Sequence, residues 1–262
     1  CNGSIWWQLN DCWPVCSWAS IDYYGNYKAL QYTARHFNAP VTVSLEDTKE
    51  EVKIFCINDT RTSVQNCSVE YRLVDFNGKQ LTSGDFGIQT LNALESRCVG
   101  TLTVAELRKF GSLKSAVLVV ELKQEETVQS RRTLLFEAEK NLRLPKTDVH
   151  MTVKIENTQA VLSITSDKYT RFLQIHSKSN TNPFSDNYFD LLPGETKIIT
   201  QQVKPSATEQ DIYADISFFS AGDVVPKGTA FTDFLTKMRV LLQPINFGSY
   251  MYDHKIPTDL KL

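Results

Sequence analysis

Apolar and polar residues alternate along much of the chain after residue 40, which is the pattern of β-strands with one buried and one solvent-facing side. In one clear example Val69, Tyr71 and Leu73 are separated by two charged residues. The dipeptide formed by Asn77 and Gly78 follows this segment, and such a pair is typical of a tight hairpin turn. The pattern therefore predicts antiparallel strands joined by short turns.

The alternating segments between residues 40 and 144 number roughly seven, the strand count of an immunoglobulin-like β-sandwich. The run 117–122 is apolar except for Glu121, as expected of a strand in a sandwich core. The stretch 104–113 lacks the alternation and predicts a short helix or an irregular crossover. We therefore predict one sandwich domain over residues 40–144.

A second series of alternating segments begins after the pair Leu144-Pro145, which we interpret as a domain boundary. Strands are expected at 149–155, 161–165, 171–175, 196–202 and 212–219. Farther on, the stretch 231–242 fits a helix and the tail 250–262 shows no regular pattern. The sequence thus predicts a second immunoglobulin-like sandwich with a C-terminal extension over residues 145–262, in a chain that is mainly β.

The first 39 residues have a different pattern. Residues 5–9 are short, apolar and aromatic, which predicts a buried strand. Apolar residues then recur at helical spacing, at Tyr27, Leu30, Ala34 and Phe37. This spacing predicts an amphipathic helix over residues 26–37 that ends before Pro40. A strand, a loop and a helix in this order form one β/α unit, which we assign to residues 1–39.

Composition excludes some classes of function. Hydrophobic residues make up 42% of the 262 residues and charged residues 22%, which is ordinary for a globular protein. The net charge of -2 predicts no attraction to nucleic acid or to an anionic membrane, and no run of 18 apolar residues predicts a membrane span. The chain does not begin with Met, and we interpret it as a piece of a longer protein. Its compartment stays open, with secreted, periplasmic or lysosomal locations favoured.

Cysteine and histidine spacing predicts no metal site and no cofactor. The six cysteines fit no zinc pattern, and the four histidines are dispersed. Cys56 and Cys67 lie on neighbouring predicted strands, so they are either bridged or isolated buried thiols. Three Asn-x-Ser/Thr sequons occur, at Asn2, Asn58 and Asn66, although so short a pattern often arises by chance.

The four tryptophans of the chain all lie between residues 6 and 18, interleaved with amide and carboxylate side chains. Indole faces stack on pyranose rings, and planar amides and carboxylates hydrogen-bond sugar hydroxyls. Candidate sugar-binding residues in this loop are Trp7, Asn10, Asp11 and Trp13. The alternative is a buried aromatic cluster in which Asp11 caps a turn.

Two stretches resemble a known family. Residues 3–42 contain IWWQLNDCWP-x3-W-x2-IDYYGNYKALQYTARHFNAPV, and residues 184–195 read FSDNYFDLLPGE. The first resembles the last β/α unit of the catalytic (β/α)8 TIM barrel in β-mannosidases of glycoside hydrolase family 2. The second resembles a segment of the C-terminal immunoglobulin-like domain of the same enzymes. Both occur in the family's order and at about its spacing.

The resemblance implies a role for this chain in removing terminal β-linked mannose from oligosaccharides. It implies that Trp7 forms the platform under the sugar and that Asn10, Asp11 and Trp13 lie at the mouth of the pocket. In related barrels the peptide bond after this tryptophan is often cis, so the resemblance implies a cis bond between Trp7 and Gln8. Trp6 is assigned to packing.

The family cleaves its substrate with two carboxylates and retention of configuration. Its acid/base lies in an Asn-Glu dipeptide, which this sequence lacks, and a barrel needs about 200 residues where only some 40 precede the sandwiches here. We therefore assign no catalytic residue, predict that this chain alone is inactive, and expect an upstream barrel domain of the same protein as its partner. The alternatives are a non-catalytic carbohydrate-binding or structural module, and a sister exo-glucosaminidase or galactosidase on the same scaffold.

Overall fold

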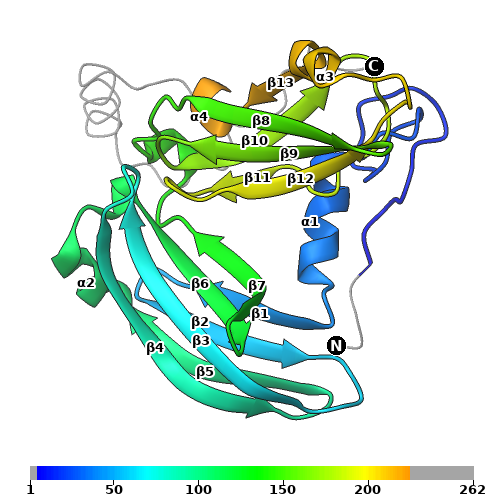
Figure 1. Ribbon diagram of the computed structural model, residues 1–262. Coiled ribbons are helices and arrows are strands. Elements are labelled where there is room, and N and C mark those ends of the chain that lie inside the picture. Colours follow the sequence, from blue (N-terminus) through cyan, green and yellow to red (C-terminus); the bar gives the residue numbers. More distant parts are fainter. Residues whose placement is uncertain (1–4, 225–262) are drawn as a thin grey trace, which may run out of the picture. The chain divides into compact units, whose positions relative to one another are not determined.

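The computed structural model describes residues 5–224. Most elements are β-strands, arranged in two sandwiches that follow an N-terminal segment with one helix (Figure 1). The prediction of a mainly β chain with two sandwiches is confirmed. The predictions for 231–242 and for the tail 250–262 lie outside the described residues.

The first sandwich consists of two antiparallel sheets, with strand orders β1-β2-β5 and β4-β3-β6-β7 (Figure 1). Its strands are β1 (Val41–Asp47), β2 (Glu51–Asn58), β3 (Val64–Asp75), β4 (Gln80–Leu91), β5 (Glu95–Thr103), β6 (Ala116–Gln124) and β7 (Thr127–Leu134). Three short helical turns connect β5 to β6, as expected: α2 (Val104–Leu107), η1 (Arg108–Phe110) and η2 (Leu113–Ser115). Apolar residues from both sheets fill the space between them.

The predicted hairpin turn joins β3 to β4. Gly78 has φ = 94°, a left-handed conformation that glycine adopts without steric cost. The Asp75 carboxylate accepts hydrogen bonds from the backbone N–H groups of Asn77 and Lys79, each at 2.9 Å. A side chain at residue 78 would meet Pro193 of the second sandwich at 3.0 Å, so glycine is also needed because the two sandwiches approach closely here.

Strand β6 is apolar on both faces because it packs against two different cores. Leu118 and Val120 belong to the core of the first sandwich, whereas Val117 and Val119 face a cluster that includes residues of the second sandwich. In that cluster Phe76 and Tyr169 stack with ring centroids 5.0 Å apart, and their rings join the two sandwiches; its other members include Leu142, Leu144 and Leu192. The long apolar run in the sequence therefore reflects an interface as well as a core.

The second sandwich has the strand orders β12-β9-β8 and β11-β10-β13. Its strands are β8 (Val149–Glu156), β9 (Gln159–Ser166), β10 (Thr170–Ser177), β11 (Phe189–Leu191), β12 (Lys197–Gln202) and β13 (Ile216–Phe219). The shorter elements are η3 (Glu139–Asn141), α3 (Glu209–Asp215) and α4 (Ala221–Val224). The strands expected at 149–155, 161–165, 171–175 and 196–202 are confirmed.

The strand expected over 212–219 is wrong in its first half, which belongs to helix α3. Thr208 caps this helix: its hydroxyl accepts from the backbone N–H of Asp211 at 3.2 Å, and the Asp211 carboxylate accepts from the N–H of Thr208 at 2.9 Å. Such a reciprocal capping box satisfies backbone donors that a helix start leaves free. Ile212 is the buried residue of this helix and packs in the core of the second sandwich. The apolar residue that suggested a strand therefore attaches a helix to the core.

The buried strand predicted over residues 5–9 is not formed. Ile5 is 98% exposed, and Trp7 and Leu9 are exposed as well. A strand needs a neighbouring strand along its length, and among the described residues this segment has only two backbone hydrogen bonds, from Ser20 and Ile21 to the carbonyls of Gln8 and Leu9, beside an isolated bridge at Asn10. The described structure therefore shows no barrel strand at this position.

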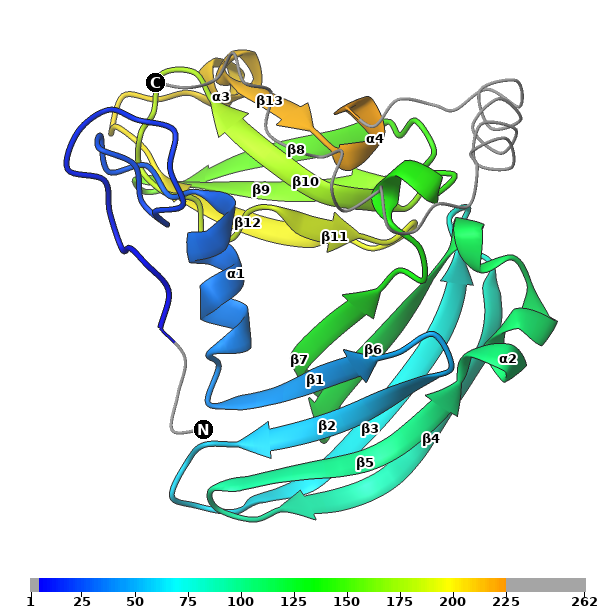
Figure 2. The ribbon, with the colours of Figure 1, turned by 180° about the vertical axis from the view of Figure 1, so that it is seen from behind.

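The predicted helix exists as α1 (Ala29–Phe37), which begins three residues later than expected. Asn26 belongs instead to a turn, in which its backbone N–H and its side-chain amide both donate to the Asp22 carboxylate at 2.8 Å. The buried residues of α1 are Tyr32 and Ala34, whereas Phe37 is exposed. Helix α1 runs beside the second sandwich and ends before β1 of the first (Figure 2).

Candidate functional site

Residues 5–28, which hold the predicted sugar-binding side chains, form a loop closed by backbone hydrogen bonds. The N–H groups of Ser20 and Ile21 donate to the carbonyls of Gln8 and Leu9, at 3.2 and 2.9 Å. The two limbs of the loop are thus held together without a sheet, and the tryptophans project from a fixed backbone.

Asp11 is the buried polar group at the centre of this loop, with an exposed fraction of 3%. Its carboxylate accepts a hydrogen bond from the Lys28 ammonium at 2.8 Å and another from the Ser17 hydroxyl. These two contacts, that of Lys28 first, hold the pKa of Asp11 below its ordinary value in spite of burial. The carboxylate therefore ties the loop to the start of α1.

The two tryptophans predicted to contact sugar are exposed: Trp7 by 72% and Trp13 by 63%. The peptide bond between Trp7 and Gln8 is cis, which confirms what the resemblance implied. Asn10 is also exposed, and among the described residues its side-chain amide makes only a 3.3 Å hydrogen bond to the carbonyl of Asp11. Trp6 packs edge-to-face against Phe37 of α1 with ring centroids 6.0 Å apart, in agreement with the packing role assigned to it.

Helix α1 is anchored to the segment 184–188 of the second sandwich. Burial raises the pKa of Tyr32 to about 12, and the Tyr32 ring lies 6.0 Å from that of Tyr188. The Arg35 guanidinium donates to the carbonyl of Ser185 at 2.6 Å. The loop with the tryptophans is therefore connected, through its helix, to residues about 150 positions farther along the chain.

His36 and Asp186 form the charged part of this anchor, with the His36 Nε2 and an Asp186 carboxylate oxygen 3.0 Å apart. The Lys197 ammonium lies 3.0 Å from the other oxygen. Burial of Asp186 disfavours its charged form, but His36 and Lys197 outweigh burial and lower its pKa to about 2. In the sequence His36 is one of four dispersed histidines, because no local pattern indicates a partner 150 positions away.

The low pKa of Asp186 predicts a pH-dependent loss of stability. A carboxyl group whose pKa is lower in the folded state stabilises the protein above its unfolded pKa, here 3.8, and this contribution disappears as the pH falls through about 2. The shift corresponds to about 2 kcal/mol. We expect Asp186→Asn to lower the unfolding free energy by about that amount at neutral pH and by progressively less below pH of about 4.

Denaturant unfolding of both proteins across this pH range measures the difference. Glu126→Gln, at the exposed tip of the β6–β7 hairpin, is the control and should leave the stability curve unchanged. A difference between wild type and Asp186→Asn that stays constant at low pH would contradict this role of the carboxylate.

The neighbouring Asn187 fixes the segment through its side chain. Its amide oxygen accepts from the backbone N–H groups of Ile175 and Tyr188, at 2.7 and 2.9 Å, and its amide nitrogen donates to the carbonyl of Ile175 at 2.8 Å. The Asp186 carboxylate also accepts from the N–H of Asn187 at 2.9 Å. The side chains of this segment therefore fix the loop by hydrogen-bonding to backbone groups.

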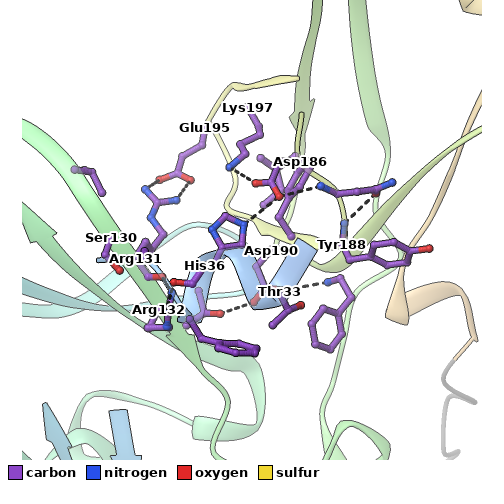
Figure 3. A pocket seen from close by; sticks show the side chains of 18 of the residues that line it. Thr33, His36, Ser130, Arg131, Arg132, Asp186, Tyr188, Asp190, Glu195 and Lys197 are labelled. Atoms are coloured by element: carbon purple, nitrogen blue, oxygen red, sulfur yellow. Dashed lines mark hydrogen bonds and ion pairs between the residues drawn. The ribbon is translucent and has the colours of Figure 1, made fainter. Parts of the chain in front are cut away.

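A cleft of about 750 Å³ opens between α1, strand β7 and the second sandwich (Figure 3). Its charged lining residues are His36, Arg131, Arg132, Arg171, Asp186, Asp190, Glu195 and Lys197. The carboxylates are already paired. Asp186 pairs with Lys197, and Glu195 pairs with Arg131 at 2.7 Å (Figure 3). Asp190 pairs with Arg171 at 2.8 Å. These groups bind one another and so fix the relative position of the elements that line the cleft.

An ionic cluster on the outer face of the first sandwich reaches the second sandwich through Glu195. Arg131 donates to Glu121 at 2.6 Å and to Glu195 at 2.7 Å, and Arg72 donates to Glu195 at 2.8 Å. Glu121 is 7% exposed. This is the residue that interrupts the apolar run of β6, so the interruption in the sequence marks a charged contact between the sandwiches.

The structure also bears on the cysteines and on metal binding. Cys56 and Cys67 are buried free thiols in the core of the first sandwich, and burial raises the pKa of Cys56 to about 12. Within residues 5–224 no group of three or more His, Cys, Asp or Glu side chains is placed to hold a metal ion. No helix in the same range has the length and apolarity to cross a membrane.

Comparison with known proteins gives matches over both sandwiches. Residues 50–141 match a family described as a mannosidase Ig/CBM-like domain, and residues 144–224 match one described as an Ig-fold domain. The chain is 26% identical over 215 residues to β-mannosidase A of Neosartorya fischeri, an alignment that covers 76% of this chain and 23% of that protein.

Two solved structures resemble the fold. The β-D-mannosidase of Dictyoglomus thermophilum matches with a TM-score of 0.68 and 25% identity, over 82% of this chain and 25% of that one. The exo-chitosanase CsxA of Amycolatopsis orientalis matches with a TM-score of 0.59 and 17% identity, over 82% of this chain and 29% of that one, which is a likeness of fold.

The two sandwiches are therefore immunoglobulin-like domains of the kind found in mannosidases. The chain belongs with the C-terminal part of the β-mannosidases of glycoside hydrolase family 2. This confirms the resemblance seen in the sequence. The chain spans about a quarter of the length of the proteins it matches, 23% and 25% in the two mannosidases above.

Proposed function

We propose that this chain acts as part of an exo-acting retaining glycoside hydrolase that removes terminal β-linked mannose from oligosaccharides. The observation that carries the proposal is the loop 5–28, on which Trp7 and Trp13 expose their indole rings from a backbone held by internal hydrogen bonds. A rigid aromatic surface beside polar groups suits a pyranose ring. The similarity to proteins named β-mannosidases supports this choice of sugar.

In this proposal Trp7 is the platform under the sugar, and Asn10 and Trp13 contribute to the mouth of the pocket. Asp11 serves the same pocket chiefly by fixing the loop, since its carboxylate is bound to Lys28 and Ser17. Residues 1–39 then belong to the last unit of a catalytic barrel, and residues 40–144 and 145–262 to two accessory domains. The two catalytic carboxylates and the remaining barrel come from residues of the same protein outside this chain.

The exposed apolar side chains of the N-terminal segment support a covering partner. Ile5 and Leu9 are exposed to solvent, as are Trp7 and Trp13, although apolar side chains such as Ile and Leu are normally buried. Several large exposed apolar side chains on one segment are typical of a surface that another part of a protein covers. The remaining units of the barrel would bury it.

The decisive experiment is an assay of the complete gene product on nitrophenyl glycosides. We expect it to release nitrophenol from the β-mannoside much faster than from the β-glucosaminide or β-galactoside. The 262-residue chain alone should give only background turnover, since it contains no Asn-Glu dipeptide for the acid/base. A preference for the β-glucosaminide would favour the sister activity, and no turnover of any glycoside would favour a non-catalytic module.

A further inference from the structure

Two Asn-x-Ser/Thr sequons lie in the described part of the first sandwich, and their asparagine side chains differ in exposure and hydrogen bonding. Asn58 begins one, with Thr60, and Asn66 begins the other, with Ser68. A folded protein can accommodate a glycan on an asparagine only where the side-chain nitrogen can project into solvent, because the glycan is bulky and polar. The question is therefore which of the two side chains is free.

Asn58 is fully buried at the end of β2, and its side chain is saturated with hydrogen bonds. Its amide nitrogen donates to the carbonyls of Thr62 and Asn92, each at 2.9 Å, and to that of Leu91 at 3.3 Å. Its amide oxygen accepts from the backbone N–H of Thr60 at 3.0 Å and from the Thr60 hydroxyl at 2.7 Å. A glycan on this nitrogen would break the bonds and fill space that the core occupies, so the folded state excludes it.

Asn66 is exposed on β3, and its side chain makes no hydrogen bond to any other described residue. It lies where the register between β3 and β4 shifts, between Val64 and Cys67, and its φ is 57°. Its backbone carbonyl accepts from the N–H of Glu125 at 3.0 Å, which holds the backbone while the side chain stays free. A β-bulge of this kind turns a side chain away from the sheet.

The hydroxyl of the serine in this sequon is also free of hydrogen bonds to other described residues. The Ser68 hydroxyl has no hydrogen-bond partner among the described residues, and Ser68 lines a shallow depression on the outer face of the sheet. The corresponding hydroxyl of Thr60 is bound to Asn58 and to the carbonyl of Thr62, at 2.7 and 2.8 Å. A left-handed backbone alone favours asparagine at residue 66 but gives no reason for serine two residues later.

We propose that Asn66 carries an N-linked glycan and that Asn58 does not. The donor is a lipid diphosphate-linked oligosaccharide of a eukaryotic secretory pathway. The Asn66 amide nitrogen forms a bond to the anomeric carbon of the first sugar and loses one proton, while the bond from that carbon to the diphosphate oxygen breaks. The lipid diphosphate leaves with the electron pair. The site is independent of the proposed hydrolase activity, because it lies in the first sandwich and not in the loop 5–28.

Trypsin separates the two sequons, since Arg61 lies between them: the peptides 54–61 and 62–72 carry one sequon each. The complete gene product, with Asn2→Gln to remove the third sequon, is secreted from eukaryotic cells and treated with peptide N-glycosidase in heavy-oxygen water. We expect peptide 62–72 to contain heavy-oxygen aspartate at residue 66 and peptide 54–61 to remain unlabelled. A sample without the enzyme controls for spontaneous deamidation.

Two variants test the assignment without disturbing the bulge. Asn66→Asp keeps a residue type that tolerates a left-handed backbone, and Ser68→Ala removes only the hydroxyl. Both variants should migrate on a gel with the mass of one glycan less than the wild type. Both should melt at the temperature of the enzymatically deglycosylated protein. Asn58→Gln should keep the glycan but melt at a lower temperature. An unlabelled peptide 62–72, or a labelled peptide 54–61, in secreted folded protein overturns the proposal.

Discussion

Replacing Arg131 with alanine is expected to lower the unfolding free energy by about 2–3 kcal/mol, because it leaves the buried carboxylate of Glu121 without its main partner. The remaining arginine, Arg72, lies 3.5 Å from Glu121 and already pairs with Glu195 at 2.8 Å. A carboxylate that is 7% exposed cannot recover full hydration, so the loss exceeds that of a surface ion pair. Denaturant unfolding measures it.

The matched control is Lys123→Ala on the same strand, β6. Lys123 pairs with Glu70 at 2.6 Å, but the Glu70 side chain is 45% exposed, and such surface pairs contribute about 1 kcal/mol or less. Because Glu195 belongs to the second sandwich, Arg131→Ala should also separate the unfolding of the two sandwiches, which Lys123→Ala should not do. Equal effects of the two variants would show that the cluster does not join the sandwiches energetically.

Replacing Trp7 with alanine in the complete gene product should lower kcat/KM for a β-mannoside by roughly 70-fold. An indole face that covers a sugar ring buries on the order of 100 Å² of apolar surface, which corresponds to about 2.5 kcal/mol at about 25 cal/mol per Å². At 1.36 kcal/mol per factor of ten this gives the stated loss. The prediction rests on the proposed role of Trp7 as a platform.

Trp18→Ala is the matched control, because Trp18 lies in the same loop, is also exposed and has the same side chain. We expect its activity to stay within about threefold of the wild type, with melting temperatures of both variants near that of the wild type. Trp7→Phe should recover part of the lost activity, since a smaller ring still stacks. Similar losses for Trp7→Ala and Trp18→Ala would point to a general effect on the loop and not to a platform.

The sandwiches could be predicted from the sequence because their signals are local. Alternation, the turn at Asn77 and Gly78, and the apolar run of β6 each require only neighbours along the chain. Helix α3 was missed since the same apolar residue, Ile212, suits a strand or a helix, and the deciding cap at Thr208 lies outside the alternating stretch. At this position the capping box at Thr208 favours a helix, although the alternation of apolar residues favours a strand.

The candidate site was predictable only in part. The tryptophans lie in a stretch that is continuous in the sequence, and the cis peptide was implied by the resemblance of that stretch to a known family. The pairing of Asp11 with Lys28 was not predicted, although it spans only 17 residues. The anchor between His36 and Asp186 joins residues 150 positions apart. Neither residue lies in a sequence pattern that indicates the other as its partner. The strand predicted at residues 5–9 was wrong. An apolar run indicates side chains that favour burial, but a strand also needs neighbouring strands to pair with, and the pattern does not show whether they are present.

The anchor of α1 on the second sandwich has a consequence for protein engineering. Chimeras that exchange only the C-terminal sandwich would pair a foreign 184–188 segment with the native Tyr32, Arg35 and His36, and the mismatch would act on the helix that supports Trp7. A recombination crossover placed before residue 29 would keep both sides of this contact together. The natural unit for exchange between relatives therefore begins inside the N-terminal segment and not at the apparent boundary between the sandwiches.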